Sequence, residues 1–172
     1  MHRFELPEKK KIKTFSRGMK MKYSLAVALA HDAELLIMDE PTSGLDPIVR
    51  SELLEILSEV IQDERKSVLF SSHITSDLDR IADYITLIHN GQILFSEPKD
   101  QLLENYILIK GGHDLLDGRL QPYLVGMREN QFGFEGLVTN KEQVQAVVGG
   151  KAILETPTLE DIMLFCTRGK VV

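Results

Sequence analysis

Residues Leu35 to Met38 form an uninterrupted apolar run that ends in two adjacent carboxylates, Asp39 and Glu40. A short apolar run between polar residues is typical of a central strand that is covered on both faces. The segment Pro41-Thr-Ser-Gly-Leu-Asp-Pro47 that follows has the composition of a turn. The stretch therefore predicts a buried strand that delivers two like charges to its carboxyl end.

Helical and extended patterns alternate around this strand. The residues after Ser16 and Thr14, two candidate N-caps, favour a helix at about 17–31. Apolar side chains at helical spacing predict a second helix at about 48–62. The apolar run at 67–72 predicts a second buried strand.

A short helix is expected at about 76–82, followed by two strands at 84–89 and 92–97. These strands flank Asn90-Gly91, which is the strongest short signal for a hairpin. Strand, helix, strand, helix and hairpin in this order predict an α/β fold whose parallel sheet carries a hairpin at its edge.

The pattern changes beyond Pro98. A helix at 99–105 leads to shorter strands and helices, and a last helix begins at Thr158 with Asp161 in the capping-box position. We therefore expect one domain over residues 1–105 and a small α+β appendage over residues 106–172.

Composition excludes several classes of protein. The 172 residues are 43% hydrophobic and 27% charged, which excludes disordered and fibrous chains. The net charge of −6 argues against a nucleic-acid partner, and no apolar run is long enough to cross a membrane. Cys166 is the single cysteine, which we interpret as a buried structural thiol.

The carboxylate pair suggests chemistry with a metal and a water. A rigid strand end can hold Asp39 toward Mg²⁺, usually through water, while Glu40 can polarise an attacking water. The alternative is an acidic pair that only caps the following turn, and the pair alone does not decide between the two.

Three neighbouring segments add to this pattern. Phe15-Ser-Arg-Gly-Met19 is a Ser-x-Gly turn that enters a helix, where Ser16 and backbone N–H groups can bind an anion. Ser43-Gly-Leu-Asp46 is a tight turn, and His73 follows the second predicted strand. Together they resemble the ATP-binding cassette (ABC) ATPase family: signature motif, Walker B strand, D-loop and switch histidine in family order.

The resemblance implies a role for each matching residue. Asp39 would help to hold Mg²⁺, Glu40 would be the general base, and His73 would contact the γ-phosphate of ATP. Ser16 and Gly18 would reach a nucleotide held by a second ABC ATPase subunit in a head-to-tail dimer, and Asp46 would link the two sites. An integral membrane transporter subunit is the other implied partner, which would hold the chain at the cytoplasmic face of the membrane.

The sequence departs from the family in two places. Arg17 replaces a glycine and Met19 a glutamine of the usual Leu-Ser-Gly-Gly-Gln; Arg17 either adds charge near the phosphate or points to solvent. No Gly-x-x-x-x-Gly-Lys-[Ser/Thr] phosphate loop occurs, and Gly149 to Ala152 lacks its first glycine and its hydroxyl. We therefore expect an incomplete P-loop NTPase core of the ABC type, an N-terminally truncated chain that is inactive alone.

Several functions follow from the resemblance. The leading one is the ATP-hydrolysing subunit of an ABC transporter, with Pro157 to Leu164 resembling the C-terminal segment of drug and bacteriocin exporters. A second is a non-catalytic module that lends its signature motif to a partner cassette, and a third is an inactive truncated product. The coiled coils of DNA-repair relatives and the paired cassettes of translation relatives are absent from this sequence.

Overall fold

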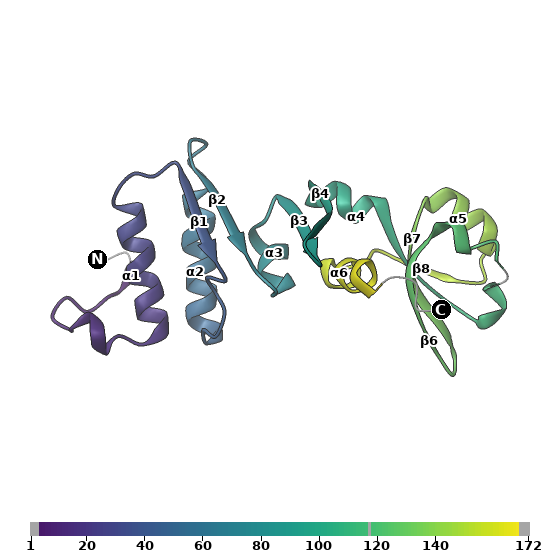
Figure 1. Cartoon of the computed structure of the whole chain (residues 1–172), viewed down its shortest axis with the longest axis horizontal. Helices are drawn as coiled ribbons and strands as arrows, with labels where there is room; N and C mark the ends of the chain where they lie inside the picture. Colours follow the sequence, from purple (N-terminus) through teal and green to yellow (C-terminus); the bar gives the residue numbers. More distant parts are fainter. Residues whose placement is uncertain (1–3, 117, 169–172) are drawn as a thin grey trace. The chain divides into compact units, whose positions relative to one another are not determined.

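The computed structural model describes residues 4–116 and 118–168. It divides the chain into two compact units, residues 1–81 and 82–172. In the described residues the first unit has one sheet and the second has two, and each unit has its own helices (Figure 1). The domain boundary predicted near residue 105 stays a prediction.

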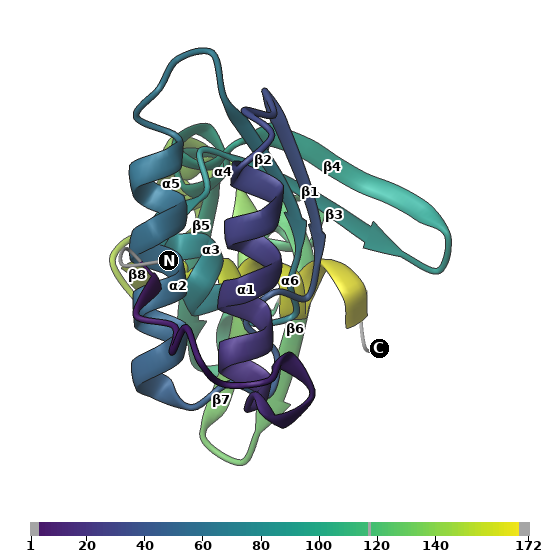
Figure 2. The same ribbon diagram turned by 90° about the vertical axis from the view of Figure 1, so that its left-hand side faces the viewer.

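In its described residues the first unit contains a two-stranded parallel sheet and three α-helices. Figures 1 and 2 show their arrangement within the unit. Strands β1 and β2 pair in parallel with Asp39 opposite Ser71, so both strands end at the same edge. The elements are η2 Ile12–Thr14, α1 Arg17–Leu29, β1 Leu35–Asp39, α2 Pro47–Val60, β2 Ser67–Ser71 and α3 Thr75–Ile81.

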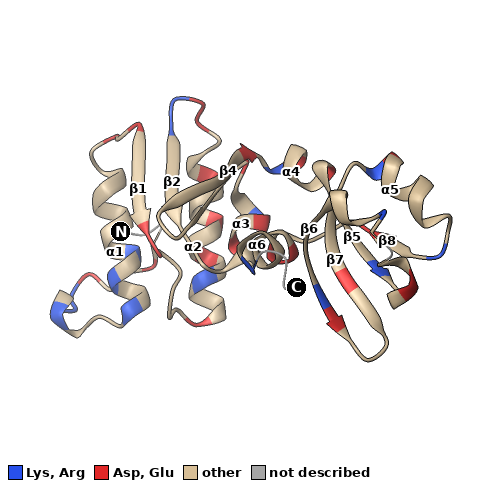
Figure 3. Ribbon diagram, turned by 45° about the vertical axis from the view of Figure 1, so that its right-hand side comes forward, with Lys and Arg blue, Asp and Glu red and all other residues tan. Residues whose placement is uncertain are grey.

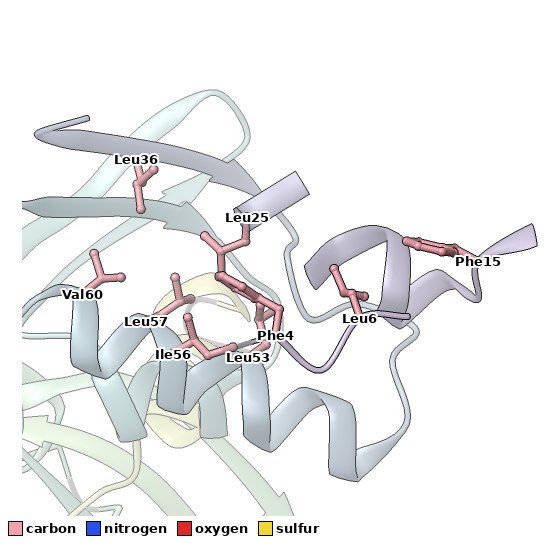
Figure 4. Close-up of a cluster of buried hydrophobic side chains, with 9 residues drawn as sticks. All are labelled: Phe4, Leu6, Phe15, Leu25, Leu36, Leu53, Ile56, Leu57 and Val60. Atoms are coloured by element: carbon pink, nitrogen blue, oxygen red, sulfur yellow. The ribbon is translucent and has the colours of Figure 1, made fainter. Parts of the chain in front are cut away.

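One hydrophobic cluster holds this unit together (Figure 4). Leu53 and Leu57 of α2 are fully buried in it, against Leu25 of α1 and Leu36 of β1. Phe4 and four further side chains complete the buried set, namely Leu6, Phe15, Ile56 and Val60. The cluster lies on the Leu36 face of the sheet, because α1 and α2 both pack there.

The other face of this sheet is exposed. Leu35, Ile37 and Leu69 point away from the cluster with exposed fractions of 53%, 71% and 61%. The prediction of a strand covered on both faces is therefore wrong for this chain. An apolar run allows a strand to be covered on both faces but does not require it. In the described residues, α1 and α2 both pack on the Leu36 face.

The second unit begins with the hairpin β3 Tyr84–His89 and β4 Gln92–Pro98. Asn90 and Gly91 have φ values of 49° and 75°, the left-handed conformation that a tight hairpin turn requires. The hairpin forms a sheet of its own, whereas we expected it at the edge of the parallel sheet. An Asn-Gly turn fixes the local pairing of its own two strands and specifies no register with a distant strand.

A four-stranded antiparallel sheet of order β6-β7-β5-β8 forms the rest of the second unit. Its register puts Ile107 and Val138 on one face, where α5 packs, and Leu108 and Leu137 on the other. Helix α6 approaches so closely on this other face that a Cβ on Gly126 would lie 2.4 Å from the Phe165 carbonyl oxygen. The elements are α4 Lys99–Asn105, β5 Tyr106–Gly111, η3 His113–Leu115, η4 Gln121–Tyr123, β6 Leu124–Asn130, β7 Gly133–Thr139, α5 Lys141–Val148, β8 Ile153–Glu155 and α6 Leu159–Arg168.

Local signals placed several helix ends correctly. Ser16 caps α1, and its side chain accepts a hydrogen bond from Met19 N at 3.2 Å. Thr158 and Asp161 form the predicted capping box, since Thr158 N donates to Asp161 Oδ2 and Asp161 N donates to Thr158 Oγ1. Among residues 4–116 and 118–168, no helix has the length and apolar character needed to cross a membrane.

Cys166 of α6 lies beside Tyr106 of β5 in the second unit and is half-buried. Burial raises the pKa of the Cys166 thiol, which leaves it protonated at neutral pH and a poor nucleophile. Burial, followed by the nearby Cys166, raises the pKa of Tyr106 to about 12. This agrees with the interpretation of Cys166 as a structural thiol.

We expect the burial of Tyr106 beside Cys166 to make the stability of the second unit fall at alkaline pH. Because the folded state favours the neutral phenol, Tyr106 contributes stability below the unfolded pKa of about 10 and loses it as the pH rises toward 12. Tyr106→Phe should flatten the fall of the free energy of unfolding across that window, measured by urea denaturation. Tyr84→Phe, at an exposed tyrosine of the same unit, should leave the slope unchanged. Equal slopes for wild type and Tyr106→Phe would contradict the assignment.

Candidate functional site

Asp39 and Glu40 lie where β1 ends, and Ser71 of β2 holds both. The Ser71 hydroxyl donates a hydrogen bond to Asp39 Oδ1. The Glu40 N–H donates to the Ser71 carbonyl oxygen at 3.1 Å, with Ser71 Oγ 3.0 Å away. Sequence reasoning missed Ser71, although a polar residue at the end of an apolar strand was a signal for it.

Glu40 has a left-handed backbone with φ of 47°. This conformation costs a non-glycine residue about 1–3 kcal/mol and tends to occur where function requires it. The bonds to Ser71 hold the backbone there. The bend turns the chain sharply from β1 into the loop of residues 41–46.

His73 comes to the Glu40 side chain from the end of β2. Its Nδ1 lies 2.7 Å from Glu40 Oε2, so a protonated imidazole would form an ion pair with the carboxylate. Oε2 is buried, and no hydrogen bond to it is found among the described residues. A buried acceptor of this kind is suited to a water or other donor that the protein does not supply.

Ser72 fixes the backbone around His73. Its Oγ accepts a hydrogen bond from Ile74 N at 3.0 Å, which closes a tight turn directly before α3. The imidazole is 69% exposed, and the Glu40 side chain 35%. The predicted base and the predicted switch histidine are in contact; the imidazole is open to solvent, and Glu40 is partly exposed although its Oε2 is buried.

Among Asp39, Glu40 and His73, only Asp39 was predicted to hold a metal. No cluster of three or more His, Cys, Asp or Glu side chains that could hold a metal lies within residues 4–116 and 118–168. Mg²⁺ commonly takes one or two protein carboxylates and completes its shell with water and phosphate oxygens. One carboxylate hydrogen-bonded to a serine hydroxyl fits that kind of site.

Asp46 begins α2. Its Oδ1 accepts hydrogen bonds from Ile48 N and Val49 N, both at 3.1 Å, and Pro47 occupies the first helical position. The side chain thus has a structural task within its own helix. Its predicted link to a second subunit stays a prediction.

The residues of the predicted signature motif contact the start of α2 and the loop before it. Gly18 is buried, and a Cβ added to it would lie 2.6 Å from Val49 Cγ1. The Arg17 guanidinium covers Gly44, which has φ of 66°, so that a Cβ there would lie 2.6 Å from Arg17 Nη1. Gly18 therefore permits close packing of α1 on α2, and Arg17 lies against the loop within the same chain.

Basic residues gather around this helix start (Figure 3). After Glu8, the next acidic residue in the sequence is Asp32. The basic residues between them are Lys9, Lys10, Lys11, Lys13, Arg17, Lys20 and Lys22. Ser16 and Arg17 are exposed, so this part of the first unit presents positive charge to solvent.

A second group of polar residues was not found from the sequence. Thr42, in the loop after Glu40, is 1% exposed, and Asp77 of α3 is fully buried. Thr42 Oγ1 donates to Asp77 Oδ2 at 2.5 Å, and Arg50 Nε donates to Asp77 Oδ1 at 2.6 Å. In the sequence, Asp77 looks like one of the polar residues of an amphipathic helix, so its burial carried no signal.

Comparison with known proteins gives related sequences over part of the chain. Residues 9–79 match the family model AAA_21, an AAA domain whose description names the AbiEii toxin of a type IV toxin–antitoxin system. The lantibiotic transport ATP-binding protein SrtF of Streptococcus pyogenes is 40% identical over 109 residues, which are 60% of this chain and 47% of SrtF. The ABC transporter ATP-binding protein sll0415 of Synechocystis is 31% identical over 91% of this chain and 46% of its own length.

The bacitracin transport ATP-binding protein BcrA of Bacillus licheniformis is 40% identical over 55% of this chain and 31% of its own length. The chain thus spans about half the length of SrtF and sll0415, and less of BcrA.

Two solved structures share the fold. One is an inward-facing metal-chelate type ABC transporter, with a TM-score of 0.51 and 20% identity over 78% of this chain and 52% of its own. The other is the ATP-binding cassette MJ0796, dimeric and bound to ADP and phosphate after hydrolysis, with a TM-score of 0.50 and 22% identity over 56% of this chain and 43% of its own. Both are P-loop NTPase folds of the ABC type, which confirms the predicted fold class.

The contact at Gly18 gives a test of its packing role. Gly18→Ala should lower the free energy of unfolding of the first unit by about 1–3 kcal/mol, because the added methyl group overlaps Val49. Val49→Ala removes the overlapping atom, so the same Gly18→Ala change should cost much less in that background. Urea denaturation, monitored through the amide NMR signals of residues 17–29, measures the loss of unfolding free energy in both backgrounds. Equal costs in the two backgrounds would contradict the packing role.

Proposed function

We propose that this chain, a homologue of ABC transporter ATP-binding proteins over part of their length, contributes residues that hydrolyse ATP in an ATP-driven exporter. The observation that carries the proposal is the contact of Glu40 with His73 at the shared carboxyl edge of two parallel strands, beside Asp39. In open α/β folds, this edge is where ligands bind.

Glu40 acts as the general base. Its Oε2 has no hydrogen-bond partner among the described residues, so once the exposed His73 ring turns away this oxygen can accept a hydrogen bond from an attacking water. The bonds to Ser71 hold the left-handed backbone that carries the carboxylate in place. Preorganisation of this kind lowers the cost of reaching the transition state.

Asp39 and His73 act on either side of this base. Asp39 would hold Mg²⁺, and its carboxylate is oriented by the Ser71 hydroxyl. Bound Mg²⁺ would neutralise charge on the phosphate oxygens of ATP. His73 contacts the γ-phosphate, and its exposed ring can turn from Glu40 toward that group.

Ser16 and the backbone N–H groups of Arg17 and Gly18, at the start of α1, face the nucleotide of a second ABC ATPase subunit. Support for this role comes from the start of α1, where backbone N–H groups and nearby basic side chains favour an anion. Asp46 links the two subunits next to this site. A membrane transporter subunit completes the assembly at the cytoplasmic face of the membrane.

A second candidate function is that of a non-catalytic module. The exposed Ser16 and Arg17 at the start of α1 favour it, because a helix start of this kind can be lent to a nucleotide that another cassette holds. In this case the chain by itself binds Mg-ATP weakly. Isothermal titration with Mg-ATP separates the candidates, because tight binding by the chain alone excludes the module.

The test of the leading function is Glu40→Gln in the transporter that contains this chain. Steady-state ATP hydrolysis should fall by about 100-fold or more, because the amide cannot accept a proton from water. Nucleotide binding should persist, because the substitution preserves the shape of the side chain. Glu64→Gln, at an exposed glutamate before β2, is the matched control and should keep full activity. Unchanged hydrolysis in Glu40→Gln would show that Glu40 is not the base.

A further inference from the structure

Asp77 and Thr42 are polar side chains in a place where polar groups are costly. Asp77 has no exposed surface and Thr42 has 1%. A buried carboxylate is tolerated when several donors compensate for its lost hydration. Here the donors come from two different parts of the first unit, the loop after Glu40 and helix α2.

Asp77 uses its two oxygens for separate partners. Oδ2 accepts the Thr42 hydroxyl at 2.5 Å, and Oδ1 accepts Nε of Arg50 at 2.6 Å, with Nη2 also 2.6 Å away. Arg50 Nη2 donates in addition to Ser76 Oγ at 2.6 Å. The carboxylate thus joins the loop of residues 41–46 and α2 to the first turn of α3.

Along the chain, Thr42 and Asp77 come after Glu40 and His73, whereas Ser71 comes before His73. Thr42 is two residues after Glu40, and Asp77 is four residues after His73. Ser71 binds the Glu40 N–H. The two segments that carry Glu40 and His73 are therefore tied together before the pair by Ser71 and after it by Thr42 and Asp77.

The hydrogen bonds from Glu40 to Ser71 and from Thr42 to Asp77 limit how the segments that carry Glu40 and His73 can move past one another. With Ser71 alone, the loop after Glu40 could pivot about β1 and carry the Glu40 side chain away from His73. The backbone N–H of Asp77 also donates to the Ile74 carbonyl oxygen at 3.1 Å, which joins Asp77 to the turn that holds His73. A buried charge-assisted bond is stronger than a neutral one, so this second tie is firm.

We infer that Asp77 is a positioning residue, which keeps Glu40 in contact with His73 through its bond to Thr42. The importance of this contact for ATP hydrolysis rests on the proposed function. The positioning itself is a property of the chain without nucleotide. Arg50 holds the second carboxylate oxygen, so that Asp77 keeps its orientation toward Thr42.

The test uses the imidazole NMR signals of His73 in the full chain without nucleotide. Glu40→Gln should shift these signals, because Glu40 Oε2 lies 2.7 Å from His73 Nδ1. Thr42→Val keeps the shape of the side chain and removes its hydroxyl. In this background the shift caused by Glu40→Gln should fall by about half or more, since the two side chains no longer meet. Thr42→Ser restores the hydroxyl and should restore the shift.

Asp77→Asn is an independent disruption. An amide offers one acceptor oxygen where the carboxylate offers two, and it carries no charge, so Thr42 and Arg50 cannot both donate to separate oxygens and the charge-assisted bonds are lost. The His73 response should fall in this variant as it does in Thr42→Val. If Thr42→Val does not fold, Asp77→Asn decides the question.

Ser51→Ala is the matched control. It removes the hydrogen bond from Arg80 Nη1 to Ser51 Oγ at 2.9 Å, which also joins α2 to α3 but does not touch Thr42. The His73 response should be unchanged in this variant. A full response in folded Thr42→Val or Asp77→Asn, or an equal loss in Ser51→Ala, would overturn the inference. Because ATP is absent, this result is independent of the Glu40→Gln hydrolysis test.

Discussion

The parallel register that places Asp39 opposite Ser71 is the constraint on which the candidate site depends. Both strands end at one edge, so the residues that follow them, Glu40 and His73, are brought together although they are far apart in the chain. Ser71 then satisfies the Asp39 carboxylate and the Glu40 N–H. A shift of the register by one residue would turn Leu36 to the open face and separate these partners.

The register is set in turn by one-sided burial. Leu53 and Leu57 of α2 are fully buried against the Leu36 face of the sheet, and α1 reaches the same cluster. The close approach of α1 to α2 requires the glycine at position 18, so a residue of the predicted signature motif also serves packing. Structure and proposed function thus use the same residues here, because the helix start that presents Ser16 must lie against the loop before α2.

Much of the local structure could be predicted from the sequence. Ser16, Thr158 with Asp161, and Asn90-Gly91 act through bonds and dihedral angles of neighbouring residues, and each was placed correctly. Relations between distant segments could not be predicted in the same way. The apolar run at β1 did not reveal that Ile37 is exposed, and the amphipathic pattern of α3 did not reveal that Asp77 is buried.

The sequence by itself determined the order of the elements, the helix caps, the hairpin turn and the residue types at the end of β1. It did so because these properties depend on neighbours along the chain. Only the tertiary structure decided that Glu40 has a strained backbone beside His73, that Arg17 covers Gly44, and that Asp77 binds Thr42. Each of these depends on which surfaces pack together, and the free energy of that packing is shared among side chains from distant parts of the chain.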